Sequence, residues 1–320
     1  MVNVAILGSG EKILQHYETL SRMKDVSVAG IVDLESQMNC VPADGQDLPV
    51  RHLEDLRQTE TELIEICVPL EKRALYIKQA ARMGFHVVCD MPIAASTEET
   101  AAVLNECQKN NVQLYPGRSL RFSPAYVDAK QQISNGAIGH PGVIRLASGG
   151  QHPGGDANIF LELGLPKVDW LVWTFGDVDH VLAKHVKTQN TAGHSVEYAA
   201  TILRMADNSI VHMELSWAQT KDSASFELAG DGGMLSYDSS SSHPINVDKR
   251  KPLAKGKSSD DILISSKLEH QLRYFSTCLN TNERRVITGK DVLKAMKVVT
   301  AIQESASIGK TVYIERGDSK

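Results

Sequence analysis

Two glycines and an acid near the amino terminus have the spacing of a dinucleotide site. Gly8, Ser9 and Gly10 follow an apolar segment and precede a helical pattern, so their backbone N–H groups could approach a pyrophosphate at the positive end of a helix. Asp33 closes the next apolar segment, where its carboxylate could accept hydrogen bonds from ribose hydroxyls. Because a 2′-phosphate would meet like charge there, the pattern predicts NAD(H) in preference to NADP(H). The alternative is a tight turn without a ligand.

A second acid and a thioether stand at another strand end. The segment HVVCDMPIA, residues 86–94, has the pattern of a buried strand that ends on Asp90 and is followed by Met91. Open α/β sheets bind their ligands at the carboxyl ends of their strands. A thioether is only a weak acceptor, so Met91 cannot carry a proton there. It can offer a polarizable, apolar wall to a ligand.

The first 120 residues alternate short apolar segments with helical patterns. We expect helices at about 11–23, 75–83 and 97–109, the second stopped by Gly84 and the third capped by Ser96 or Thr97. Alternation of this kind predicts a doubly wound (Rossmann) parallel sheet that is covered on both faces. The expected strands are Val2–Leu7, Val26–Asp33, Leu63–Val68, His86–Cys89 and Val112–Tyr115.

The pattern then changes to two-residue alternation. Between Val143 and Tyr237 several such segments are separated by turn signals, which predicts an open, largely antiparallel sheet. Helical patterns at about 268–281 and 289–307 precede a last strand, Thr311–Ile314. We therefore expect an α/β protein with a dinucleotide-binding domain at 1–120. An α+β domain for substrate binding and oligomerisation would follow at 121–320.

Composition excludes several classes of function. The net charge of -5, with both signs interspersed, argues against nucleic acid as a partner. The chain has no apolar run of membrane-spanning length and starts directly with a strand, so we expect a cytoplasmic protein without a membrane partner. The cysteines indicate reduced thiols and no metal site, because they are scattered and odd in number: Cys40, Cys67, Cys89, Cys107 and Cys278.

The order of these pieces resembles the glucose-fructose oxidoreductase/inositol dehydrogenase (Gfo/Idh/MocA) family along nearly the whole chain. The segment ELIEICVP, ending at Val68 and Pro69, is similar to the family's strand that ends in Thr-Pro, and HVVCDMPIA occupies the place of an "HVLCEKP(L/I)A" segment. LELGLPKVD, residues 161–169, stands where the family has D-x-G-x-H-x-x-D. The resemblance implies hydride transfer between NAD(P) and a sugar, polyol or related small molecule. It also adds Val68, Pro69, Asp90 and Met91 to the cofactor site.

The family's catalytic residues do not all carry over. The Lys of its E-K-P segment and the His of its later motif align with Met91 and Pro166, while Glu162 retains a carboxylate. Arg73 stands where many members have a His. Since a polyol dehydrogenase must remove a hydroxyl proton as hydride leaves, we expect a rearranged catalytic set of Lys167, Glu162 and Tyr115. The alternatives are that Lys167 is exposed at the start of its helix, that Glu162 is purely structural, and that Tyr115 only packs in the core.

Other residues could contact the substrate. Arg118 and Arg121 could bind an anion, although Arg121 could instead form an interdomain ion pair. His152 could reach the cleft if its Gly-rich loop folds over it; otherwise it is a surface histidine.

The function predicted is that of an NAD(H)-dependent oxidoreductase, and the alternative is a non-catalytic sensor or scaffold that keeps the fold. Hydrolysis with transient redox use of NAD, known in one branch of the family, ranks third. An open sheet face predicts a homodimer or homotetramer.

Overall fold

Two compact units make up the chain. The computed structural model describes residues 1–35, 49–50, 52–117, 119–189, 193, 195–241, 245–249, 271–275, 277–278 and 287–315. One unit comprises Met1–Phe122 and Leu263–Leu293, and the other comprises Ser123–Ile262 and Lys294–Lys320. The first break lies two residues from the expected position at 120. A single boundary could not include the later segment that returns to the first unit.

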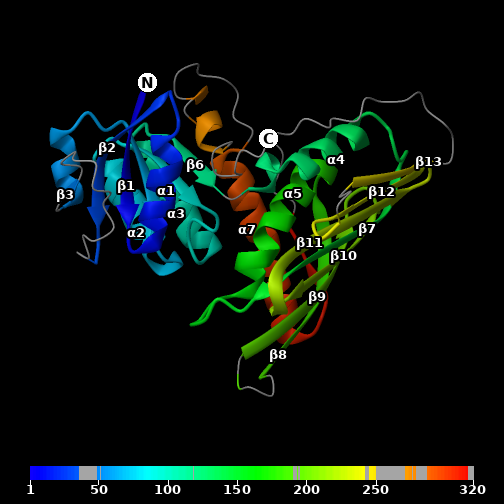
Figure 1. Ribbon diagram of the computed structural model, residues 1–320. Coiled ribbons are helices and arrows are strands. Elements are labelled where there is room, and N and C mark those ends of the chain that lie inside the picture. The colour runs from blue at the N-terminus through cyan, green and yellow to red at the C-terminus, as the bar shows by residue number, and fades with distance from the viewer. Residues whose placement is uncertain are drawn as a thin grey trace. The chain divides into compact units, whose positions relative to one another are not determined.

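The first unit is built on a six-stranded sheet in which every pair of neighbours is parallel (Figure 1). Its order, β3-β2-β1-β4-β5-β6, places β1 in the interior and confirms the doubly wound prediction. The central strands are buried on both faces, as their continuous apolar runs predict. The strands are β1 (Val2–Gly8), β2 (Val26–Asp33), β3 (Pro49–Val50), β4 (Leu63–Cys67), β5 (His86–Asp90) and β6 (Leu114–Gly117).

Helices α1 (Glu11–Ser21), α2 (Leu70–Arg82) and α3 (Thr97–Lys109) connect these strands. The side chain of Ser96 accepts a hydrogen bond from the Glu99 N–H, which is the predicted cap of α3. Helix α2 starts five residues before the expected position, directly after Pro69. Short 3-10 turns lie at Leu53–Gln58 (η2) and Leu120–Phe122 (η3).

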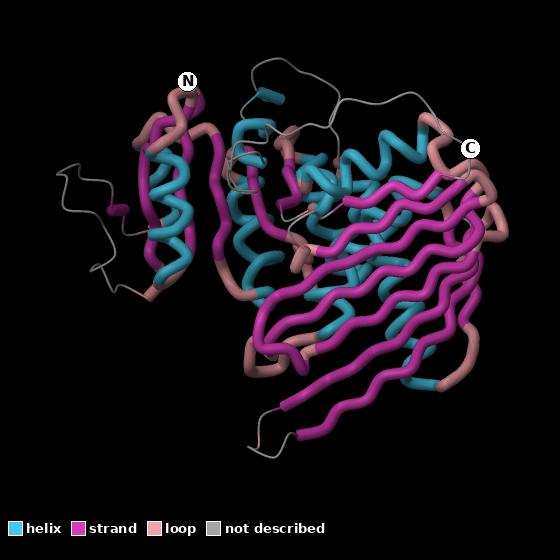
Figure 2. Tube along the Cα trace, turned by 45° about the vertical axis from the view of Figure 1, so that its right-hand side comes forward, coloured by secondary structure: helices cyan, strands magenta, loops and turns pink. Residues whose placement is uncertain are grey.

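The second unit contains an eight-stranded sheet of order β13-β12-β11-β7-β10-β9-β8-β14 (Figure 2). Only β7 and β10 pair in parallel, so the expected largely antiparallel sheet is confirmed. The strands are β7 (Pro141–Gln151), β8 (Val178–Gln189), β9 (Ser195–Met205), β10 (Ile210–Ser216), β11 (Ala218–Gly230), β12 (Gly233–Asp238), β13 (Ile245–Lys249) and β14 (Val312–Tyr313).

Helices cover one face of this sheet. Helix α4 (Pro124–Ser134) and helix α5 (Leu165–Phe175) pack through Tyr126 and Trp170 onto Phe226 of β11. A π-helical turn, Phe160–Gly164 (η4), leads into α5. Helix α7 (Gly289–Ile308) begins in the first unit and continues in the second, where the Ser305 hydroxyl accepts a hydrogen bond from the Ala183 N–H of β8.

The other face of the sheet carries exposed apolar side chains. We call it the open face. Its exposed large apolar residues lie on β7, β8, β9 and β10: Val143, Val186, Tyr198, Ile202 and Ile210. Within the described part of the chain, no helix is long and apolar enough to cross a membrane.

Candidate functional site

Parallel pairing brings the expected cofactor residues to one edge of the first unit's sheet. Gly8 of β1 lies in register with Asp33 of β2 and with Cys67 of β4. On the other side, Asp90 of β5 pairs with Gly117 of β6, and the Met91 N–H donates to the Gly117 carbonyl at 3.1 Å. The residues that follow these strands therefore share one edge: Ser9, Gly10, Val68, Pro69 and Met91.

The turn after β1 leaves no room for a side chain at its first glycine. A Cβ added to Gly8 would lie 2.9 Å from the Cys67 carbonyl oxygen and 3.2 Å from Cγ1 of Ile13. Ile13 occupies the third position of the G-x-G-x-x-G pattern. The close approach of helix to strand, which that third glycine supports in the full pattern, is here made at Gly8.

Gly10 is the N-cap of α1, a position that suits an anion. Its φ of 61° favours glycine, and it has no side chain to cap the helix. The first N–H groups of a helix have no intrahelical partner, and together with the helix dipole they attract negative charge. The turn therefore fits the pyrophosphate of a dinucleotide.

Asp33 ends β2 beside this turn. One of its carboxylate oxygens, Oδ1, accepts a hydrogen bond from the Glu35 N–H at 3.0 Å, and the Leu34 N–H donates to the Gly8 carbonyl at 2.9 Å. The second bond holds the backbone that follows Asp33 against the glycine turn. The residues present fit NAD(H), which would supply hydride chemistry at this edge.

Arg73 connects two of the loops at this edge of the sheet. The side chain is buried, and its Nε donates to the Val68 carbonyl at 3.1 Å. Its Nη1 donates to the carbonyls of Asp90 at 3.1 Å and Pro92 at 2.7 Å. The sequence showed only that Arg73 replaces a common histidine. The structure shows that it cross-links the segments after β4 and β5.

Met91 is 2% exposed and lies directly after β5. Its burial is consistent with an apolar wall and excludes a solvated side chain. Contact with a nicotinamide stays a prediction.

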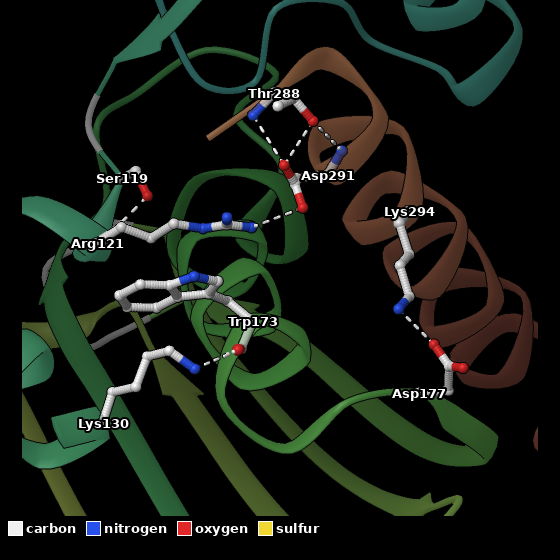
Figure 3. A network of polar contacts seen from close by, with 8 residues as sticks. All are labelled: Ser119, Arg121, Lys130, Trp173, Asp177, Thr288, Asp291 and Lys294. Carbon is white, nitrogen blue, oxygen red and sulfur yellow. Dashed lines mark hydrogen bonds and ion pairs between the residues drawn. The ribbon is translucent and has the colours of Figure 1, made fainter. Parts of the chain in front are cut away.

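Two predicted residues of the first unit have structural partners. Tyr115 is buried in the hydrophobic core, where its ring centroid lies 5.0 Å from that of Phe275. Arg121 is also buried and forms an ion pair with Asp291 at 3.5 Å, while Asp291 accepts hydrogen bonds from the N–H and hydroxyl of Thr288 (Figure 3). Arg121 and Asp291 both belong to the first unit, so this ion pair is not the interdomain pair considered as an alternative. Arg118 lies outside the described residues.

Lys167 of the second unit is 3% exposed, so the alternative of an exposed lysine is wrong. Its Nζ donates to the hydroxyl of Tyr126 and lies 4.7 Å from the centroid of that ring. Burial raises the pKa of Tyr126, so the phenol stays neutral. Elsewhere in this unit, Lys130 donates to the Trp173 carbonyl, and Lys294 pairs with Asp177 (Figure 3).

Glu162 is half-buried in the π-helical turn η4. Asn158 organises this turn, because its side-chain oxygen accepts from the Phe160 and Leu161 N–H groups and its carbonyl accepts from the Glu162 N–H. Single π-turns are frequent at functional sites. Pro166, at the place of the family's histidine, lies in the first turn of α5.

His152 belongs to a polar cluster that sequence analysis missed. Glu197 of β9 is buried and contacts the Nε2 atoms of His152 at 3.3 Å and His185 at 2.9 Å, and Nζ of Lys187 at 2.8 Å. Because Nδ1 of His152 accepts from the Gly154 N–H, its Nε2 donates to the carboxylate. His152 also packs on Trp217. The expectation of a surface histidine is therefore wrong.

Electrostatics keep Glu197 ionised. Burial alone would raise the pKa of Glu197, but hydrogen bonds from Lys187 and His185 outweigh it and lower the pKa. Glu197, His185 and Lys187 line a groove of about 530 Å³ together with Phe160. The sequence signal for this cluster was Glu197, a charged residue at a position of β9 where two-residue alternation predicts a buried side chain.

Two family models match the chain. The model described as "Oxidoreductase family, NAD-binding Rossmann fold" matches residues 2–118, and "GFO/IDH/MocA C-terminal domain" matches residues 126–236. Together they cover more than half of the 320 residues.

Similar proteins span nearly the same length. An uncharacterized oxidoreductase of Bacillus subtilis, YrbE, is 25% identical over 97% of this chain and 96% of its own. D-apiose dehydrogenase of Paraburkholderia graminis is 22% identical over 97% of this chain and 89% of its own. The WlbA dehydrogenase of Bordetella pertussis, solved with NADH and UDP-GlcNAcA, is 18% identical and covers 99% of each chain with a TM-score of 0.82. At that identity the structural likeness supports the fold alone.

The cross-link made by Arg73 predicts a cost in stability. In Arg73→Met, three backbone carbonyls lose a charged donor, which we expect to lower the free energy of unfolding of the first unit by about 2–3 kcal/mol. Calorimetry is the suitable measurement, since all three tryptophans lie in the second unit. Arg73→Lys should recover little, because one ammonium cannot replace the planar fork. The control is Lys72→Met at the exposed neighbour. Equal melting curves for Arg73→Met and Lys72→Met would contradict the prediction.

Proposed function

Because the chain belongs to the Gfo/Idh/MocA oxidoreductase family, we propose that it is an NAD(H)-dependent oxidoreductase. Its substrate would be a small sugar, polyol or related carbonyl or imine compound. The observation that carries the proposal is the single edge of the first unit's sheet, where Gly8 pairs in register with Asp33 and Gly10 caps the helix that follows. Characterised relatives such as D-apiose dehydrogenase are dehydrogenases of small carbohydrates.

The carboxylate of Asp33 supports NAD(H) over NADP(H). It ends β2 in register with Gly8 and would face the adenosine ribose, where a 2′-phosphate would add a second negative charge. When bound, the cofactor would supply the hydride chemistry. The first unit's own residues would bind its pyrophosphate and ribose, with Met91 as an apolar neighbour.

Proton handling then falls to the second unit. We assign it to Glu162, a half-buried carboxylate in the π-turn. His152 is less suited to contact the substrate, because its Nε2 donates to Glu197 and its Nδ1 accepts from the Gly154 N–H. Lys167 and Tyr115 are less suited as direct proton donors, because each is buried against an aromatic partner.

A non-catalytic sensor or scaffold is the second candidate. Met91 and Pro166 replace both the lysine and the histidine of the family pattern, and neither side chain can exchange a proton. Such a protein would bind the dinucleotide or a small ligand without turnover.

Cofactor preference is tested at Asp33. By calorimetry, NADH should bind wild-type protein more tightly than NADPH. Asp33→Ser should weaken NADH at least tenfold, since a charge-assisted hydrogen bond contributes about 1.5–3 kcal/mol. Asp25→Ser, at an exposed acid of the same unit, is the control and should leave the affinity for NADH unchanged. Tighter binding of NADPH by the wild type would overturn the assignment.

Turnover is tested with a panel of aldoses, polyols, ketoses and imines, followed by NADH absorbance. For the best substrate, Glu162→Gln should lower kcat by about 10²–10⁴-fold while NADH affinity stays the same. Glu304→Gln, an exposed acid of α7, is the control. If NADH binds but no substrate turns over, the non-catalytic sensor or scaffold replaces the oxidoreductase as the better-supported function. If Glu162→Gln retains full kcat, the proton is handled elsewhere.

We also propose that the open face joins two or more copies into a homodimer or homotetramer, because its apolar side chains cluster on one sheet surface. Ile202→Glu puts a charge at the middle of that face and should reduce the mass measured by light scattering to that of a monomer. Leu75→Glu is the control, since Leu75 is a similarly exposed apolar residue on α2. A wild-type monomer at micromolar concentration would refute the proposal.

A further inference from the structure

Three side chains of different chemistry meet between α1 and β4 in the first unit. His16 lies in the middle of α1, and Glu65 and Cys67 are alternate residues of β4, so both project from the same face of the strand. Nδ1 of His16 lies 2.7 Å from Oε1 of Glu65. One ligand atom from each of the three residues lies within 4.8 Å of the others.

Glu65 is the unusual member of this cluster. It is 2% exposed and lies between Ile64 and Ile66 in an interior strand of the sheet. Its second oxygen, Oε2, is buried and has no hydrogen-bond partner among the described residues. A buried carboxylate is costly unless its oxygens are hydrogen-bonded, paired with a cation or bound to a metal ion. His16 therefore satisfies only one of the two oxygens.

The three donor types match a borderline-soft metal ion. Zinc binds imidazole nitrogen, carboxylate oxygen and thiolate sulfur at 2.0–2.3 Å, which puts ligand atoms about 3.3–3.8 Å apart in a tetrahedral site. The three atoms are already gathered within the 4.8 Å limit, so side-chain adjustments of about an ångström would produce that spacing. A thiolate in the set disfavours Mg²⁺ and Ca²⁺, which prefer oxygen ligands.

We propose that His16, Glu65 and Cys67 bind a divalent transition-metal ion, Zn²⁺ by their donor chemistry. Water or a further ligand would complete the coordination. The ion would neutralise the Glu65 carboxylate and cross-link α1 to β4. This departs from the expectation of no metal, which rested on cysteine spacing alone.

The site lies behind the glycine turn. Cys67 pairs with Gly8, and its carbonyl oxygen and Cβ are the atoms that a side chain at Gly8 would meet. A metal-bound Cys67 would therefore stiffen the backbone against which that turn packs. The proposal does not depend on the proposed oxidoreductase activity.

The experiment uses the full-length protein, stripped with a chelator and titrated with Co²⁺. Wild-type protein should bind one equivalent and develop the near-ultraviolet absorption of a thiolate–cobalt bond, and Zn²⁺ should displace it. Cys67→Ser should abolish this absorption, and His16→Gln should weaken Co²⁺ affinity at least tenfold. Cys107→Ser removes a buried thiol of α3 outside the cluster and should match the wild type.

The wild-type titration keeps the proposal falsifiable even if a variant folds poorly. Absence of thiolate–cobalt absorption in wild-type protein overturns it, as does absorption that survives in folded Cys67→Ser. A second readout is thermal: ligand binding to the native state alone raises its melting temperature. Stoichiometric Zn²⁺ should raise the melting temperature of wild-type protein and of Cys107→Ser but not of Cys67→Ser. An equal rise in all three proteins would place the ion elsewhere and contradict the assignment.

Discussion

The cofactor edge depends on the missing side chain at Gly8. Strand β1, strand β4 and helix α1 converge there, and even one added carbon would lie 2.9 Å from the Cys67 carbonyl oxygen. Because β1 is an interior strand, any displacement at this point would also move β2 and the Asp33 that pairs with Gly8. The packing of one residue thus positions both the helix N-terminus and the acid at its side.

The rest of that sheet edge is held together by a buried cation, the guanidinium of Arg73. Arg73 donates to the carbonyl of Val68, which follows β4, and to the carbonyls of Asp90 and Pro92 at and after the end of β5. The guanidinium suits this task because its planar fork has several donors and remains charged when buried. The same segments carry Val68, Pro69, Asp90 and Met91. Arg73, which stands where many members of the family have a histidine, therefore has a structural role here.

In the second unit, several polar groups lie on the helix-covered face of the sheet. Glu197 is ionised inside an apolar surface because two histidines and a lysine surround it. Beside that cluster, the ring of Phe160 in the π-turn packs against His185, and Glu162 lies two residues farther along. This arrangement gives the unit acid–base groups although Pro166 has replaced the usual histidine. It motivates proton handling by a different set of residues.

The fold class and the family could be predicted from sequence, and both are confirmed. Apolar periodicity and turn residues are local properties, so the strand–helix alternation before residue 120 and the two-residue alternation after it were visible along the chain. Element ends were less certain: α2 starts earlier than its helical spacing showed, because Pro69 can precede a helix. The segment at 263–293 joins the first unit through contacts that no local pattern records.

The sequence by itself determined which residue types were available at the site, including the glycines, Asp33 and the loss of the usual lysine and histidine. Only the tertiary structure decided what surrounds them. His152 and Glu197 are 45 residues apart, and His16 and Glu65 are 49 apart, yet each pair is in contact. Such pairings follow from strand order and register, which bring distant segments together. The spacing of residues along one strand or helix contains no information about the neighbour across the sheet.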